Sequence, residues 1–267
     1  MSIKNLKIYC VTNKQINFIN KKEYNFGWVG KGKNPFSYIP CNNKDNIFYK
    51  ERYYSELTFH YWYWKNLLEL EKDDQWVGFC QRRRHWIENN TEEVINSDNI
   101  NNFLLIDAKK EWNNYDSLIC KPIKISGAKR IKLIKRGWKN ILKKPSILLK
   151  EKLQTISVHF DMHHGYGNLS KAIKLLENED RNDFLEYVNS NDEFNPHIMF
   201  ITKKKIMNKW FNVLFPWLER CEKVFGFENL EGYDKTRIYA YLAERFLSFW
   251  FKKYTTYKEQ AWTFIDV

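Results

Sequence analysis

One stretch, residues 45–84, constrains the fold more than any other part of the chain, because a helical pattern in it is followed by a buried-strand pattern. Aromatic and aliphatic residues recur at helical spacing and predict one buried stripe: Tyr54, Leu57, Tyr61, Trp64 and Leu68. The apolar run Trp76–Cys80 then predicts a buried strand, and Arg82, Arg83 and Arg84 follow it. The arginines are therefore expected at the carboxyl end of a strand.

Polar groups lie within this aromatic stretch. Glu56, Lys65 and Asn66 are in or beside the predicted apolar surface, where an ionised group is costly unless it has a partner. A bound polar ligand would be such a partner. Ligands of open α/β sheets collect at the carboxyl ends of strands, and arginine matches phosphate oxygens with two parallel hydrogen bonds. The three arginines therefore predict a diphosphate site, and the alternative is a solvated basic turn.

Other runs predict the remaining elements. A first strand is predicted at Leu6–Thr12, with Asn13 and Lys14 as the turn beyond it and Gly27–Gly32 as a loop. Later strands are predicted at Phe103–Ile106, Leu118–Cys120 and Ile198–Ile201. Helices are predicted at 168–189, 203–225 and 233–254. This order favours an α/β fold with a helical C-terminal section.

Size and composition bound the class of protein. A chain of 267 residues can bury a core of one domain, and a hydrophobic content of 43% excludes general disorder. The first residues lack a signal-peptide pattern, and no apolar run reaches the roughly 20 residues of a membrane span. We therefore expect a cytoplasmic protein. Its scattered cysteines predict free thiols in a reducing compartment and argue against a zinc site: Cys10, Cys41, Cys80, Cys120 and Cys221.

Much of the net charge of +12 comes from residues 129–152, where ten lysines and arginines stand against one glutamate. Apolar residues of this segment follow helical spacing: Ile131, Ile134, Trp138 and Leu142. Such a basic amphipathic helix suits an anionic membrane surface, and we expect this surface to be contacted by Lys132, Lys135, Arg136, Trp138 and Lys139. One alternative is a core-packed helix with a solvated basic face. The other is nucleic-acid binding, which the single stackable side chain, Trp138, disfavours.

The motifs occur in an order that resembles a family of bacterial proteins long catalogued as a domain of unknown function. These proteins are found with capsule and lipopolysaccharide genes and are regarded as glycosyltransferases. The similarity includes Lys7–Tyr9, Thr12–Lys14, Val29–Gly30, residues 45–84, Met199–Ile201, Arg237 and Ala243–Arg245. The chain departs from the family at Gln81, where a histidine is usual, and at Ile198, where an asparagine is usual.

The resemblance implies a GT-A-like nucleotide-binding sheet closed by a helical section. We expect one glycosyltransferase domain over residues 1–267. Its expected parts are a nucleotide-sugar-binding part (1–125), a basic amphipathic segment (126–152) and an acceptor-side helical part (153–267). The residues expected to hold the nucleotide sugar are Thr12, Asn13, Lys14, Gly30, Asp45, Asn46, Glu56, Lys65, Asn66, Gln81, Arg83 and Arg84.

Inverting glycosyl transfer uses a carboxylate to deprotonate the acceptor hydroxyl. Glu244 is the first candidate, because it lies in an apolar helical pattern and in the family's Glu-Arg segment. The alternative for Glu244 is a buried ion pair with Arg237 or Arg245. Asp161 is the second candidate, and a strand there would place His159, Asp161 and His163 on one face as a metal or acceptor site.

The strand that ends at the arginines carries no Asp-x-Asp pair of the kind that holds a metal in many GT-A enzymes. We therefore expect cationic side chains to neutralise the diphosphate without a required cofactor, and a divalent metal held by acids elsewhere is the alternative. The expected function is transfer of a hexose from a nucleotide sugar to a glycan, in bacterial surface polysaccharide synthesis. The expected acceptor is lipid-linked, at the inner membrane face. The alternative is a non-enzymatic basic protein that binds RNA or anionic lipid.

Overall fold

The computed structural model describes residues 5–20, 23–127 and 130–267. The chain forms two compact units. The sheet unit comprises Met1–Lys121, His197–Val213 and Phe251–Val267, and the helical unit comprises Pro122–Pro196 and Leu214–Trp250. None of the helices in the described ranges combines the length and apolar character that crossing a bilayer requires.

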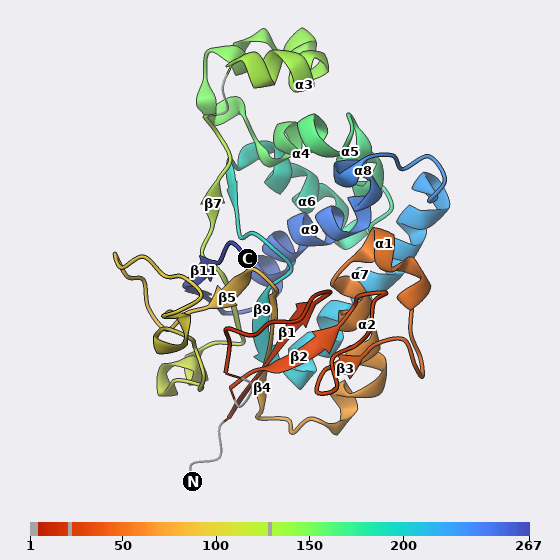
Figure 1. The fold of residues 1–267 in the computed structure, drawn as a ribbon. Coiled ribbons are helices and arrows are strands. Elements are labelled where there is room, and N and C mark those ends of the chain that lie inside the picture. The colour runs from red at the N-terminus through yellow and green to blue at the C-terminus, as the bar shows by residue number, and fades with distance from the viewer. Residues whose placement is uncertain (1–4, 21–22, 128–129) are drawn as a thin grey trace. The chain divides into compact units, whose positions relative to one another are not determined.

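The sheet unit is built on a largely parallel sheet (Figure 1). Its main path runs β10-β6-β9-β4-β1-β2-β3, and β5 and β11 extend it beside β4. The strands are β1 (Leu6–Thr12), β2 (Asn25–Trp28), β3 (Ile39–Pro40), β4 (Trp76–Gln81), β5 (Arg84–Trp86), β6 (Ser117–Cys120), β9 (Phe200–Lys203), β10 (Tyr257–Gln260) and β11 (Trp262–Phe264). Strands β1 to β4 run parallel, whereas β9 is antiparallel to β4 and β6. The carboxyl ends of β1, β2 and β4 therefore share one edge, called here the carboxyl edge.

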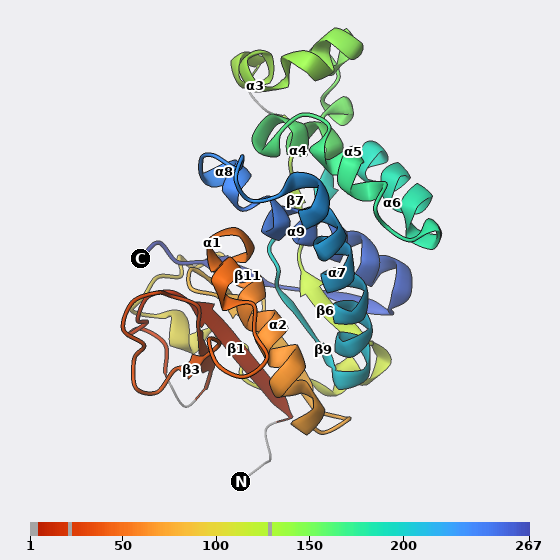
Figure 2. The same ribbon diagram turned by 90° about the vertical axis from the view of Figure 1, so that its right-hand side faces the viewer.

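Side chains of β1 alternate between two buried faces. Leu6, Ile8 and Cys10 belong to one apolar cluster. Tyr9 points to the other face, where its ring lies 5.9 Å from Phe59 and 4.9 Å from Tyr63. Those two residues belong to α2 (Leu57–Asn66), which lies along β1 in Figure 2. A strand buried on both faces explains the continuous apolar run that predicted it.

The helices of the sheet unit include α1 (Glu51–Tyr54), α2 and the first residues of α7 (Lys204–Phe225). Short 3-10 helices lie at Phe48–Lys50, Leu68–Leu70, Ile100–Asn102 and Lys110–Asn114. The prediction of one buried stripe on α2 was too narrow. Phe59, His60 and Tyr63 are all buried, whereas Tyr61 and Trp64 are only half-buried. This helix is enclosed on several sides, so its burial is not a single stripe.

Three other predictions for the sheet unit need correction. Phe103–Ile106 is not a strand, because its one ladder contact is an isolated bridge from Leu104 to Ile87. Gly27 lies in β2 rather than in a loop, and a Cβ there would come 2.5 Å from the ring of Phe59, so glycine lets α2 pack on β2. The predicted helical C-terminal section ends at Tyr254, after which β10 and β11 rejoin the sheet.

The helical unit packs its helices around aromatic side chains, and the ring of Phe184 lies 5.2 Å from Phe246. Its elements are α3 (Arg130–Lys143), α4 (Ile156–His164), α5 (Asn168–Ile173), α6 (Asn178–Ser190), the part of α7 from Leu214 onward, α8 (Tyr233–Thr236), most of α9 (Ile238–Tyr254) and the antiparallel pair of β7 (Ile123–Lys124) with β8 (Glu193–Phe194). Short 3-10 helices lie at Pro145–Leu148 and Glu151–Leu153. The helix predicted at 168–189 is thus two helices, and the one at 233–254 is interrupted at Arg237.

The prediction of a strand around Asp161 was wrong, because residues 156–164 form α4. Burial does alternate along this segment, as it would in a strand. The cause is a helix covered on two opposite sides. Val158 and Met162 pack with Ile147, whereas Phe160 and His164 contact each other on another face, one helical turn apart.

Candidate active site

The carboxyl end of β1 closes in a tight turn. The Thr12 hydroxyl donates to the Lys14 carbonyl at 2.6 Å, and the Lys14 amide donates to the same hydroxyl at 3.1 Å. Thr12 is buried, while Asn13 and Lys14 are exposed. The turn therefore presents these two polar side chains at the carboxyl edge, where sequence reasoning expected them.

Gly30 lies in the loop after β2, next to the turn of β1. A Cβ at Gly30 would come 2.9 Å from the Asn13 carbonyl oxygen and 2.7 Å from the Trp28 ring. Only glycine allows this approach without displacement. The two loops therefore form one continuous surface at the edge, and Gly30 keeps them together.

Glu56 follows a strained residue. Ser55 is buried and has φ 53° and ψ −128°, a conformation that is costly for any residue with a side chain. It joins α1 to α2, whose Phe59 packs on β2 and whose Tyr63 packs on Tyr9 one turn later. Helix α2 thus runs opposite to the strands and begins near the carboxyl edge. Glu56 is half-buried there, and within the described ranges its carboxylate forms no hydrogen bond or ion pair.

The other end of α2 carries Lys65 and Asn66. These residues are separated from Glu56 by the length of the helix, about 14 Å at 1.5 Å per residue. The Asn66 amide donates to the Asp45 carbonyl at 2.8 Å, and the Lys65 ammonium lies 3.5 Å from the centre of the Trp64 ring. Asn46 accepts a hydrogen bond from the Phe48 amide at 3.0 Å. The structure therefore groups Asp45, Asn46, Lys65 and Asn66 away from Glu56.

The three arginines form the hairpin between β4 and β5. Gln81 pairs with Arg84 in the ladder, and Arg82 and Arg83 make the turn. Gln81 is buried, and its Oε1 accepts from Arg84 Nη1 at 3.3 Å. The Nε of Arg84 is buried, and no acceptor for it occurs among the described residues. An N–H donor in that position suits an anionic oxygen.

Residues 264–267 lie against this hairpin, a contact that sequence reasoning missed. Arg83 Nη1 lies 3.6 Å from an Asp266 carboxylate oxygen, and Arg82 donates to the Val267 carbonyl. The Phe264 ring centre lies 5.3 Å from Arg83 and 5.5 Å from Arg84. Arg82 and Arg83 are thus partly engaged by the chain itself, whereas Arg84 keeps a buried Nε–H without an acceptor among the described residues.

The two proposed catalytic carboxylates, Glu244 and Asp161, both lie in the helical unit. Glu244 forms an ion pair with Arg245, whose side chain is only 3% exposed. The Arg245 guanidinium lies 3.8 Å from the centre of the Phe194 ring, and its Nη2 is 3.3 Å from Nδ1 of His159. The ion pair with Arg245, which the sequence analysis gave as an alternative role for Glu244, is therefore present.

Asp161 accepts a hydrogen bond from the Gly167 amide at 2.9 Å. Burial is the largest influence on its pKa and raises it above the ordinary value. The hydrogen bond holds the turn after α4, where Gly165 and Gly167 both have positive φ. Asp161 thus points to a different place from His159 and His163, whose rings stack 4.5 Å apart.

A cavity of about 330 Å³ opens beside those histidines. The residues that line it combine apolar and polar side chains: Ile123, Lys124, Ile125, Ser126, Gly127, Gln154, Val158, His159, Met162 and His163. Arg245 contacts His159, so the Glu244–Arg245 pair is linked to the wall of this cavity. The sequence predicted His159 and His163 as neighbours, but the helix, not a strand, brings them together.

Helix α3 presents the residues expected at a membrane surface. Ile134, Trp138 and Leu142 are 54%, 51% and 73% exposed and lie one turn apart. Lys135, Arg136 and Lys139 are exposed as well. Gly137 instead faces Met162 of α4, 3.2 Å from where its Cβ would be. The side chains of Ile131 and Lys132 lie outside the described residues.

Comparisons with known proteins agree with this architecture. A family model described as "Domain of unknown function (DUF4422)" matches residues 7–256. No curated protein matches the chain. A solved structure of an apo bifunctional glycosyltransferase, WbbM, has a TM-score of 0.70 and 21% sequence identity to it, and the match covers 98% of this chain. The chain spans 45% of the WbbM chain, and the likeness confirms the expected α/β, GT-A-like fold.

Proposed function

Because this chain belongs to the DUF4422 family and shares the fold of part of a bifunctional glycosyltransferase, we propose that it is itself a glycosyltransferase. It would transfer a hexose from a nucleotide-sugar donor to a glycan of a bacterial surface polysaccharide. The donor would bind at the carboxyl edge of the sheet unit, where α/β sheets usually bind ligands. The observation that carries this proposal is the buried Arg84 Nε, which has no acceptor among the described residues.

Three groups at this edge would divide the work of donor binding. The backbone of the Thr12–Lys14 turn and Gly30 would shape the floor for the nucleotide. Arg84, with support from Arg83, would neutralise the diphosphate as it leaves. Glu56 would bind a hydroxyl of the ribose or the sugar, because an ionised carboxylate accepts hydrogen bonds strongly.

The helical unit would bind the acceptor. Its cavity of about 330 Å³ has apolar walls and imidazole groups, a combination that suits a sugar ring with hydroxyl groups. Glu244 would act as the base that deprotonates the acceptor hydroxyl. Its pairing with Arg245 would orient the carboxylate.

Thermal denaturation with a panel of nucleotide sugars tests the proposal. We expect one nucleotide class to raise the melting temperature, because a ligand that binds only the folded state stabilises it. Arg84→Ala should then weaken nucleoside diphosphate binding by about 2 kcal/mol, roughly 30-fold. Arg83→Ala should cost less, since Asp266 already shares that guanidinium. Equal affinity of wild type and Arg84→Ala would remove the hairpin from the donor site.

We also propose that α3 contacts an anionic membrane and so brings the enzyme to a lipid-linked acceptor at the inner face. Exposed apolar side chains beside a row of lysines support this. All five cysteines are free, which agrees with a reducing compartment on that side. Binding to vesicles of anionic lipid should weaken with added salt and with Trp138→Glu. Lys205→Gln, which lowers the net charge by the same one unit at an exposed position outside α3, is the control.

The same measurement addresses the rival function, a basic protein that binds RNA. Preference for an oligonucleotide over vesicles, with a steep dependence on salt, would favour that rival. If Trp138→Glu weakens neither vesicle binding nor oligonucleotide binding, the apolar side of α3 is not the contact surface, and the membrane proposal would be withdrawn.

A further inference from the structure

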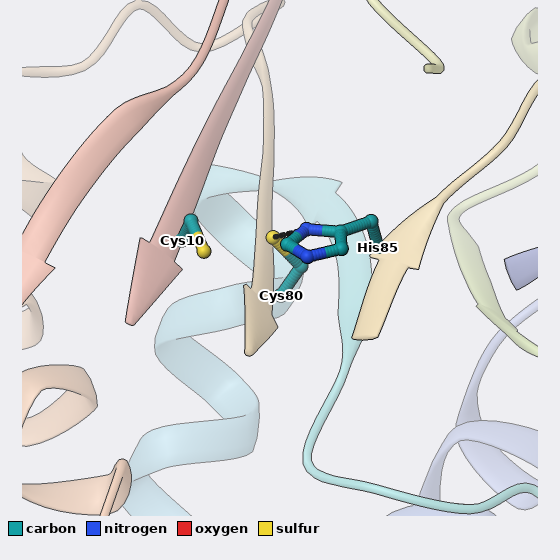
Figure 3. A group of neighbouring side chains, drawn as sticks. All are labelled: Cys10, Cys80 and His85. Carbon is teal, nitrogen blue, oxygen red and sulfur yellow. Dashed lines mark hydrogen bonds between the residues drawn. The ribbon is translucent and has the colours of Figure 1, made fainter. Parts of the chain in front are cut away.

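Three side chains of types that can bind a metal ion come from neighbouring strands and lie close together beneath the carboxyl edge (Figure 3). Cys10 of β1 and Cys80 of β4 are partners in the parallel ladder, so their side chains leave the same face of the sheet. His85 comes from β5, which follows the arginine hairpin. The two Sγ atoms and a ring nitrogen all lie within 4.8 Å of one another, and all three residues are buried.

The ring of His85 is oriented as a ligand would be. Its Nε2 lies 3.0 Å from the Arg82 carbonyl oxygen, which can only accept, so Nε2 carries the proton and donates. The lone pair of Nδ1 then faces Cys80 Sγ at 3.9 Å. Metal-binding histidines typically donate their second N–H to a carbonyl or carboxylate in this way.

The distance between the sulfur and the nitrogen is close to that of a metal site. Zinc bonds of about 2.3 Å to sulfur and about 2.0 Å to nitrogen place these atoms roughly 3.6 Å apart in a tetrahedron and about 3.8 Å apart in a trigonal plane. The observed 3.9 Å therefore needs a movement of only a few tenths of an ångström.

We propose that Cys10, Cys80 and His85 bind one thiophilic cation, Zn²⁺ or Cu⁺. The cation would tie together β1, β4 and β5 directly beneath the proposed donor site, because Cys10 precedes Thr12 by two residues and Cys80 and His85 bracket the arginine hairpin. It would be a structural ion, since burial separates it from any substrate. Cu⁺ accepts three such ligands, whereas Zn²⁺ would need a water as its fourth.

Metal binding by the reduced, chelator-stripped wild-type protein tests the proposal without reference to activity. We expect one equivalent of Zn²⁺ or of Cu⁺ to bind, and competition with a chromophoric chelator for each ion shows which is preferred. Co²⁺, as a probe of the same ligands, should give thiolate charge-transfer absorption. At about 100-fold excess over its dissociation constant, the preferred ion should raise the melting temperature by about 5 °C.

A matched pair of variants locates the ion. Cys80→Ala should weaken binding by at least about 100-fold, whereas Cys120→Ala removes a buried thiol from the same apolar cluster and should leave binding unchanged. His85→Phe should weaken binding but retain thiolate absorption. If folded wild-type protein binds no stoichiometric ion, or if Cys80→Ala binds as wild type does, the cluster is only packing and the proposal fails. Should Cys80→Ala not fold, the wild-type stoichiometry and Co²⁺ spectrum decide alone.

Discussion

Arginines occupy opposite environments in the two units. At the carboxyl edge of the sheet unit the Arg83 side chain is 41% exposed, and its partner Asp266 is 85% exposed. In the helical unit Arg245 is 3% exposed and lies between Glu244 and the Phe194 ring. An exposed pair contributes about 0–1 kcal/mol to stability, whereas a buried charge without its partner is strongly destabilising. The same side chain can thus serve a ligand in one unit and the fold in the other.

The largest expected effect is on the stability of the helical unit. Arg245→Ala removes the partner of a nearly buried carboxylate, so the free energy of unfolding should fall by about 3–5 kcal/mol. Urea unfolding measures it. Arg83→Ala, the control at the carboxyl edge, should change stability by less than about 1 kcal/mol. Equal losses of unfolding free energy in Arg245→Ala and Arg83→Ala would show that the two arginines do not differ in their contribution to stability.

Glu244→Gln asks whether the buried pair also has a chemical role. The amide keeps the size of the side chain and can still accept from Arg245, but it cannot take a proton. We expect turnover to fall about 100-fold, with donor affinity unchanged. Steady-state kinetics below the melting temperature of the variant measures both quantities.

Normal transfer by Glu244→Gln would leave Glu244 with only the ion pair seen in the structure. Asp161→Asn would then be the next variant, with the expectation that the turn held by the Gly167 amide loosens. A loss of stability without a loss of turnover in that variant would exclude both carboxylates as the base.

The two units also differ in how far their sequences predict their structures. The boundaries of β1, and of α7 to within one residue, follow from the sequence, because a continuous apolar run and a long amphipathic pattern each have one simple solution. Helix α4 was predicted as a strand, because burial on two opposite sides alternates its pattern. The spacing of apolar residues in a sequence indicates which positions will be buried. It does not indicate which other elements will pack against them.

The candidate site shows the same division. Thr12, Gly30 and the arginine hairpin could be placed from local order, since each follows a strand. The separation of Glu56 from Lys65 could not, because it depends on the direction in which α2 crosses the sheet. The meeting of Cys10 with Cys80 depends on strand pairing across 70 residues, so the scattered cysteines gave no sign of a shared site.

Two buried histidines, one in each unit, extend the comparison to pH. Burial lowers the pKa of His60 to about 3. Burial, followed by the charge of Arg245, lowers the pKa of His164 to about 3. Below pH 6.5 these two histidines bind protons in the unfolded chain but stay neutral in the folded chain. The stability present above pH 6.5 is therefore lost as pH falls toward 3. Each histidine should contribute about 2 kcal/mol of lost stability between pH 7 and pH 5, and its slope should approach about 1.4 kcal/mol per pH unit at the lower end, as measured by urea unfolding.

Phenylalanine variants separate the two contributions. His60 Nδ1 has no hydrogen-bond partner among the described residues, so His60→Phe should halve the slope and raise stability at low pH. His164 Nδ1 donates to the Asp234 carbonyl at 2.9 Å, so His164→Phe should remove its share of the slope but lower stability at pH 7. A wild-type slope that neither variant changes would assign the acid sensitivity to carboxylates instead.

The smallest expected effect concerns the strained residue that precedes Glu56. Ser55→Gly relieves a conformation that costs an L-residue about 1–3 kcal/mol, but the glycine also increases the entropy of the unfolded chain. We expect a net stabilisation of about 1 kcal/mol by urea unfolding. Donor affinity should decrease, because the turn no longer holds Glu56 in one orientation at the carboxyl edge.

Lys44→Gly is the matched control, since Lys44 also has a positive φ, 51°, but precedes Asp45 in the segment that lies against the far end of α2. It should stabilise the fold without changing donor affinity. If Ser55→Gly binds the donor as tightly as wild type, the strain does not serve the site. If Lys44→Gly weakens donor binding instead, the nucleotide lies along α2 toward Lys65. The proposal that the donor binds at the carboxyl edge would then be wrong.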